Sequence, residues 1–406
     1  MLSITLYLII NLENLGSLIF LILFKMKKTI VLLIAMFFCV SCKKAEESTD
    51  KKNSITEIDM SIGHNEKKFC ELVEELSLVK LETTKHSLIG GINQIEVFDN
   101  KIFVHDLKTQ SILIFEYPTG NYINKVESIG NGPGEYFNIS SFSIEKDERL
   151  LALLDINLRK IFKFNFEGEF IDSKTIPFYA HSFSYMNDDE NVIFSNFSLS
   201  EDATNDYQAI VTDKNFNILN KFLKIERFSS MQIKQGNQIS VLDNQTMFLP
   251  KNSVNSYIVN SKGIKTKYLF NFKENWNEDI FYKEVDSPRE LVQVLNKKEI
   301  IRALGVTEND GFLLFSFWFL DDHYLATYNK EIDQLNYIKK DKNGFENRFF
   351  IKGYYQNYFI SYKYHDNLKI AAKNDIECLI SEDDKKMISN LNEIDNPILI
   401  FTKFKK

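Results

Sequence analysis

Several residue types that would mark a chemical function are scarce or unpatterned in this chain of 406 residues. The six histidines, listed here as His64, His86, His105, His181, His323 and His365, are never spaced as a local metal-binding pair. No Gly-x-Ser-x-Gly elbow is present to carry a serine nucleophile. The net charge is −7, and no basic block is present that could neutralise phosphates. We therefore predict no metal, no cofactor and no nucleic-acid partner, and no catalytic residue can be named.

Cysteine is also rare, and two of the four cysteines lie at the end of an apolar N-terminal region. Met26 begins a stretch with a basic start and a short apolar run, which is typical of a signal peptide and shorter than the ~20 residues of a membrane span. The run ends in Cys39-Val-Ser-Cys42, which resembles a bacterial lipobox. We expect residues 1–41 to be a signal region and Cys42 to carry lipid; the alternative is a plain signal peptide. Because residues 1–25 precede a complete signal peptide, Met26 is the expected start, the alternative being an extra membrane segment.

The segment after Cys42 is charged and has few apolar residues, so residues 42–68 are expected to form a flexible tether. Glu46-Glu47 behind the lipidated cysteine resembles the surface-export signal of Bacteroidetes-type lipoproteins, although any solvated linker could have this composition. The two remaining cysteines, Cys70 and Cys378, lie near opposite ends of the folded part. They form either a disulfide or two buried free thiols.

A repeat of short strands dominates the rest of the chain. Asp106 and Asp155 end similar apolar runs 49 residues apart, and the same distance separates Phe115 from Phe164. A repeat near 50 residues made of strands and turns is typical of a β-propeller. We predict an all-β, six-bladed β-propeller over residues 69–406, with short helical insertions within 273–300 and 376–391. The strand 76–82 is expected to pair with the C-terminal strand, because closing a propeller from both ends protects the sheet edges.

A glycine-rich stretch, Ile129-Gly-Asn-Gly-Pro-Gly-Glu-Tyr136, lies between the first two repeats. A dinucleotide-binding loop would require a helix after it, whereas strands follow here. Gly130, Gly132, Pro133 and Gly134 therefore favour a tight inter-blade turn. Glu135 and Tyr136 are expected to point toward a ligand at the axial face. Asp106 and Asp155 are expected to cap turns by accepting backbone N–H groups.

Several of these motifs also occur together in a known order. Val79-Lys-Leu-Glu-Thr-Thr84, Gly132-Pro-Gly-Glu-Tyr136, the two repeated aspartates and Asn396-Pro-Ile-Leu-Ile400 resemble the six-bladed propeller lipoproteins of Bacteroidetes, which are related in architecture to NHL-repeat propellers. This resemblance implies a cell-envelope lipoprotein, often linked with polysaccharide-uptake systems. It implies no general activity.

The functional expectation is a binding or scaffolding propeller, anchored by lipid to the outer membrane on a side that the sequence leaves open. Its expected partners are a carbohydrate or peptide ligand and an outer-membrane uptake complex. The alternative is a propeller-scaffold enzyme acting on glycans, a lyase or hydrolase. Paired carboxylates or a histidine cluster at one mouth of the axis would favour the enzyme, whereas aromatic rings with amides would favour binding. Trp276, Trp318, Tyr354 and Tyr355 could stack on sugar rings, although core positions are the simpler explanation.

Overall fold

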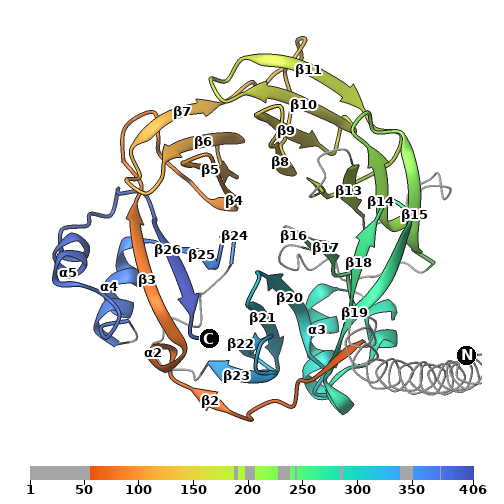
Figure 1. Ribbon diagram of the computed structural model, residues 1–406, viewed down its shortest axis with the longest axis vertical. Helices are drawn as coiled ribbons and strands as arrows, with labels where there is room; N and C mark the ends of the chain where they lie inside the picture. Colours follow the sequence, from red (N-terminus) through yellow and green to blue (C-terminus); the bar gives the residue numbers. More distant parts are fainter. Residues whose placement is uncertain are drawn as a thin grey trace, which may run out of the picture. The chain divides into compact units, whose positions relative to one another are not determined.

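The computed structural model describes residues 55–186, 191–196, 206–226, 238–242, 245–283, 287–338, 351–374 and 376–406. Residues Thr56–Lys406 form one compact unit. Its strands make six small sheets arranged radially around a central axis (Figure 1), which confirms the predicted six-bladed β-propeller. Within the described ranges, no helix is both long enough and apolar enough to cross a membrane.

Each blade has four antiparallel strands, and in the first five blades these strands pair in sequence order. The first blade contains β4 (Ile92–Phe98), β5 (Lys101–Asp106), β6 (Ser111–Glu116) and β7 (Tyr122–Val126). The second contains β8 (Ser141–Glu145), β9 (Leu150–Asp155), β10 (Lys160–Asn165) and β11 (Phe170–Thr175). The third contains β12 (Ser182–Tyr185), β13 (Asn191–Ser195), β14 (Tyr207–Asp213) and β15 (Ile218–Lys224).

The remaining blades follow the same plan. The fourth contains β16 (Ile239–Leu242), β17 (Gln245–Phe248), β18 (Asn255–Asn260) and β19 (Gly263–Asn271). The fifth contains β20 (Arg302–Glu308), β21 (Phe312–Phe319), β22 (Asp322–Asn329) and β23 (Gln334–Ile338). The sixth contains β24 (Gly353–Tyr355), β25 (Tyr358–Lys363) and β26 (Ile398–Phe404) from the C-terminal end, with β3 (Val73–Lys80) from the N-terminal end.

The ring is closed by the pairing of β3 with β26, in which Leu76 lies opposite Thr402 and Val79 opposite Leu399. This closure is the one that the sequence predicted. The last blade therefore depends on both ends of the chain, and the outer edge of β26 is covered by β3 instead of being exposed.

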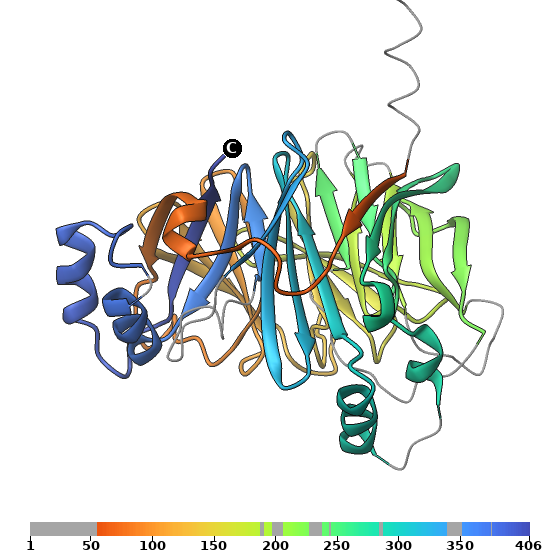
Figure 2. The ribbon, with the colours of Figure 1, turned by 90° about the horizontal axis from the view of Figure 1, so that it is seen from below.

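The stretch 56–67 forms two further strands, and we call it the N-terminal strap. β1 (Thr56–Asp59) pairs parallel to β19, and β2 (Glu66–Lys67) pairs parallel to β23. Met60 between them is fully buried, and its carbonyl accepts a 2.8 Å hydrogen bond from Tyr337 Oη. Figure 2 shows the strap crossing the outer side of the neighbouring blades. The predicted flexible tether therefore ends earlier than residue 68, and residues 42–54, with Cys42, lie outside the described residues.

A disulfide joins Cys70 and Cys378, whose Cα atoms are 6.4 Å apart. Cys70 lies in α2 (Phe69–Leu72), between the strap and β3. Cys378 lies between α4 (His365–Asn374) and α5 (Glu382–Ser389), which are inserted before β26. The bond therefore links the N-terminal entry into the closing blade with the insertion that precedes its C-terminal strand.

A second insertion connects the fourth and fifth blades. It contains the 3₁₀ turns η3 (Lys273–Asn275) and η4 (Glu278–Tyr282) and the helix α3 (Pro288–Lys297). Ser287 Oγ accepts from Glu290 N at 3.2 Å, so α3 begins at the serine–proline start signal that predicted it. Leu291 and Leu295 pack on Ile280 and Phe281 in a small separate core.

Candidate functional site

The innermost strands of the blades surround a central channel, which contains a cavity. Its volume is about 490 Å³, within the ~300–1,000 Å³ range of small-molecule sites. Residues of β4, β8, β12, β16 and β24 line it, whereas β20 itself contributes none and only Asp310 beyond its end takes part. Its polar side chains are mainly amides and hydroxyls, together with three carboxyl groups and one lysine: Gln94, Glu96, Asp99, Ser141, Ser143, Lys146, Ser182, Ser184, Tyr185, Gln238, Asp310, Tyr354, Tyr355, Gln356 and Asn357.

Side chains connect the inner strands to one another across the gaps between blades. Gln94 on β4 donates from Nε2 to the carbonyl of Phe142 on β8 at 2.7 Å, and its Oε1 accepts from Phe142 N at 3.3 Å. Ser143 Oγ accepts from Tyr185 N on β12 at 3.2 Å. Gln94 and Ser143 therefore occupy backbone groups at the inner edges of β8 and β12, which an extended peptide entering the channel would otherwise use.

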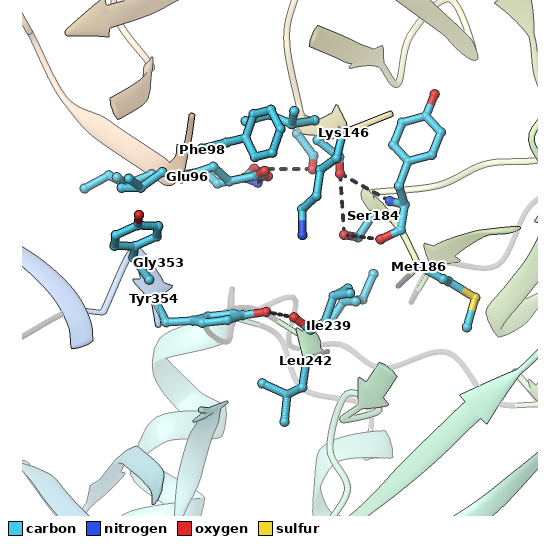
Figure 3. A pocket seen from close by; sticks show the side chains of 18 of the residues that line it. Glu96, Phe98, Lys146, Ser184, Met186, Ile239, Leu242, Gly353 and Tyr354 are labelled. Atoms are coloured by element: carbon cyan, nitrogen blue, oxygen red, sulfur yellow. Dashed lines mark hydrogen bonds between the residues drawn. The ribbon is translucent and has the colours of Figure 1, made fainter. Parts of the chain in front are cut away.

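Tyr354 crosses the channel on the opposite side. It belongs to β24 in the sixth blade, yet its hydroxyl donates to the carbonyl of Val241 on β16 in the fourth blade. The ring therefore passes in front of β20 and closes the wall at the fifth blade. Figure 3 shows it across the channel from Glu96 and Lys146, with Ile239 and Leu242 beside it.

Glu96 is the carboxyl group on the inner strand β4 that lines the channel. Burial in the channel wall raises its pKa from 4.5 to about 7, against the opposing effects of Lys146, the Ile144 N–H group and Gln94, which donates to Glu96 Oε1 at 2.9 Å. Glu96 is therefore partly protonated near neutral pH and can both donate and accept hydrogen bonds. Lys146 is exposed in the turn after β8 and extends into the same space (Figure 3).

The two predicted ligand residues lie away from this channel. Tyr136 is fully buried, and its hydroxyl donates to Gln110 O at 2.9 Å and accepts from Ser128 N at 3.2 Å. Glu135 accepts from Gly132 N at 2.7 Å within its own loop. The expectation that both residues face an axial ligand is corrected: the glycine-rich turn directs the tyrosine back into the core between two blades, and the glutamate caps the turn.

The glycine-rich loop is a compact turn between β7 and β8. Gly134 adopts φ +80°, and a Cβ atom added there would approach the Phe170 ring to 2.7 Å. A residue with a side chain would therefore be strained at this position and would also clash. Strands flank the loop on both sides, and Glu135 occupies the space beside Gly130 and Gly132, so the loop has the geometry of a structural turn.

Asp106 and Asp155 each join two loops. Asp155 accepts four backbone N–H groups at 2.8–3.1 Å, from Phe137 and Asn138 in the preceding inter-blade loop and from Asn157 and Leu158 in the following turn. Asp106 accepts in the same way from the loop before β4 and the turn after β5. Both are fully buried, and neither lines the channel, so their geometry is that of turn caps.

Two further buried carboxylates, Glu145 and Glu308, are paired with lysines. Glu145 accepts from Lys163 Nζ at 2.6 Å, and Glu308 accepts from Lys267 Nζ at 2.6 Å and Lys330 Nζ at 3.0 Å. In the described part of the chain, no three histidine, cysteine, aspartate or glutamate side chains come together as a metal site.

The sequence signals for this channel were weak. Gln94 and Glu96 lie in an ordinary alternating strand, and nothing local indicates that this face of the strand points to the axis. Of the four candidate stacking aromatics, Tyr354 and Tyr355 line the channel. Trp276 instead packs on Phe281 in the inter-blade insertion.

The architecture and the channel define a class: a six-bladed β-propeller with an axial cavity of ligand size. The sequence matches the family described as "Domain of unknown function (DUF4934)" over residues 55–403, and the chain belongs to this family. None of the curated proteins matches it.

Many solved structures have a similar fold, among them two from Bacteroides species. One is described as a "Putative exported protein" from Bacteroides fragilis: it is 22% identical, the match covers 87% of this chain and 100% of that chain, and the TM-score is 0.74. The other is a member of the DUF4221 family from Bacteroides vulgatus: it is 12% identical, with 82% and 97% covered and a TM-score of 0.52. At these identities the similarity shows the shared fold.

Proposed function

We propose that this protein is a cell-envelope lipoprotein whose propeller binds a small polar ligand in the central channel. The observation that carries the proposal is the channel lining, in which amides, hydroxyls and the Tyr354 ring surround a cavity of about 490 Å³. Binding sites for small polar molecules combine apolar or aromatic surface with a few placed hydrogen-bonding groups. A short segment of either expected ligand class, carbohydrate or peptide, would fit into this cavity.

Attachment to the envelope rests on the lipobox-like Cys39-Val-Ser-Cys42 and on the exported relative from Bacteroides fragilis. Growth with a radiolabelled fatty acid tests it directly. We expect the label in the wild-type protein and none in Cys42→Ser. Label in both proteins would place the lipid elsewhere, and label in neither would leave a plain signal peptide. The relation to NHL-like lipoproteins stays a prediction.

An envelope lipoprotein that binds a small polar ligand would be suited to an accessory role in nutrient uptake. Detergent extraction of the native protein from its own membranes, followed by mass spectrometry of the proteins that accompany it, tests this role. Stoichiometric recovery of an outer-membrane transporter would support it and would narrow the ligand to that system's substrate. Recovery of the protein alone would contradict a stable complex and leave the channel-binding function to be tested separately.

Glu96 favours a second candidate, a glycan lyase or hydrolase on the same scaffold. A carboxyl group with a pKa near 7 suits a general acid or base. Glycosidases pair two carboxylates roughly 5–10 Å apart, whereas the described lining places Lys146 beside Glu96, and Asp99 and Asp310 lie in turns beyond the strands. Incubation with glycans and analysis of the products separates the two candidates. Turnover that disappears in Glu96→Gln while binding persists would favour the enzyme.

A further inference from the structure

The channel has two unlike walls. On the side of the first three blades, Glu96 of β4, Lys146 after β8 and Ser184 of β12 supply polar groups, with Phe98 and Met186 beside them. Across the axis, Ile239 and Leu242 of β16 and the Tyr354 ring of β24 supply apolar surface, with Gln238, Gln356 and Asn357 at the ends of these strands. Figure 3 shows these two groups facing each other across the cavity. A ligand in the channel therefore meets charged and hydroxyl groups on one side, and an aromatic ring with aliphatic side chains on the other.

Few backbone groups are open to a peptide in this space. The Gln94 amide bonds both the N–H and the carbonyl of Phe142, and Ser143 accepts the Tyr185 N–H. Ile95 N, on the other side of β4, donates to Lys352 O at 2.9 Å beside β24. A peptide that binds as an added strand needs a free edge with both donors and acceptors, and these side chains and neighbouring strands already use several of the edge groups.

The polar wall is suited to hydroxyl groups. Gln94 is occupied by Phe142 and by Glu96, so it positions the Glu96 carboxyl and has little capacity left for a ligand. Glu96 of β4 and Lys146 in the turn after β8 extend into the cavity from adjacent blades (Figure 3). A hydroxyl group both donates and accepts. Two neighbouring hydroxyls can therefore donate to the Glu96 carboxyl and accept from the Lys146 ammonium. Asp99 and Asp310 also line the cavity, so its carboxyl groups outnumber its lysine, and this disfavours an acidic ligand.

The apolar wall is suited to the C–H face of a ring. The hydroxyl of Tyr354 is held by the Val241 carbonyl, so the ring is fixed across the channel without any ligand. An aromatic ring that is already in place loses little conformational entropy when a flat apolar surface packs on it. A pyranose ring presents such a C–H face, and its hydroxyl groups project around its rim.

We propose that the channel ligand is an uncharged sugar ring, whose C–H face packs on Tyr354 and whose neighbouring hydroxyls lie between Glu96 and Lys146. This inference rests on the proposed function and narrows it, because it excludes peptides and acidic sugars as the principal ligand. Glu96, Lys146 and Tyr354 are then the residues that determine specificity, and Gln94 is a positioning residue.

Calorimetric titration of the full chain in detergent tests the inference, with three probe sets: neutral monosaccharides and their disaccharides, glucuronate and galacturonate, and short peptides. We expect binding from the neutral set, weakened at least tenfold in Glu96→Gln and in Tyr354→Leu. Tyr354→Phe keeps the ring and should bind within threefold of wild type. The matched controls are Glu274→Gln and Tyr179→Leu, both exposed and outside the channel, which should bind as wild type does.

The outcomes separate this inference from the proposed function. Uronate or peptide binding that depends on Glu96 and Tyr354 would leave the channel as the site and overturn the neutral-sugar assignment. Sugar binding that is as strong in Glu96→Gln and in Tyr354→Leu as in wild type would place the ligand outside the channel. This result would overturn both the neutral-sugar assignment and the proposed function. No binding from the neutral set would overturn the sugar assignment, provided that unfolding curves show wild type and variants to be folded. If Glu96→Gln fails to fold, sugar binding is measured instead in Ser184→Ala, which is a smaller change in the same wall.

Discussion

Replacement of Glu96 by glutamine should change how the stability of this propeller depends on pH. The folded protein raises the pKa of Glu96 from 4.5 to about 7 because the channel wall buries the carboxyl. The native state therefore binds a proton more tightly than the unfolded chain does. The stability that this proton contributes is fully present below about pH 4.5 and is lost as the pH rises through 7. Glutamine cannot titrate, so the variant lacks this contribution.

The expected size follows from the two pKa values. One unit of difference corresponds to about 1.4 kcal/mol, and the interval from pH 5 to pH 8 covers most of the titration. The wild type should therefore lose about 2–3 kcal/mol of unfolding free energy over this interval relative to Glu96→Gln. Lys146 opposes the shift, so Lys146→Gln should move the Glu96 transition to higher pH.

Urea denaturation at pH 5, 6, 7 and 8, followed by tryptophan fluorescence, measures this difference. Subtracting the variant curve from the wild-type curve removes the titration of every other group. The matched control is Glu274→Gln, whose pH profile should follow that of wild type because Glu274 is exposed. Parallel profiles for wild type and Glu96→Gln would refute the reasoning and show that the channel keeps Glu96 hydrated and ionised.

The remaining predictions concern the structural positions. Gly134→Ala should lower the unfolding free energy by about 1–3 kcal/mol through its left-handed backbone, whereas Gly263→Ala, where an added Cβ meets nothing within 4 Å, should have little effect. Asp155→Ala should cost at least about 3 kcal/mol in urea denaturation, because it removes a charged acceptor from four N–H groups; a loss under 1 kcal/mol would show that water replaces it. Reduction of the Cys70–Cys378 disulfide should lower stability by about 2–5 kcal/mol, and an unchanged melting temperature in reductant would contradict a structural role.

Much of the fold could be predicted from the sequence because the repeat is local. Each strand and turn is specified by a few consecutive residues, and the spacing between Asp106 and Asp155 gives the size of a blade directly. The start of α3 at Ser287-Pro288 is a signal of the same kind. The strap was missed because its pairing is remote: Ile58 lies opposite Phe270, and a strand of four residues carries little periodicity of its own.

The channel was harder to predict than the blades. Whether a side chain on an inner strand points to the axis or between blades depends on how six sheets are placed, which no short stretch of sequence records. Glu96 was overlooked for this reason, whereas Tyr354 was singled out only as an aromatic residue. Tyr136 was misplaced because the turn at Gly134 reverses the direction of the chain, so the residue after the exposed loop returns to the core.

The order of β1, β2, Cys70 and β3 along the chain also determines which contacts would break first if the N-terminal end were pulled. A pull on the N-terminal end reaches β1 first, then β2, and then Cys70, before it reaches β3. At Cys70 the disulfide diverts the load into the α4–α5 insertion, so β3 stays paired with β26. The strap can therefore detach under tension while the ring of blades remains closed. Detachment would free roughly 40 Å of extended chain, at about 3.5 Å per residue, and the strap would act as an extensible segment between the N-terminal end and the closed ring.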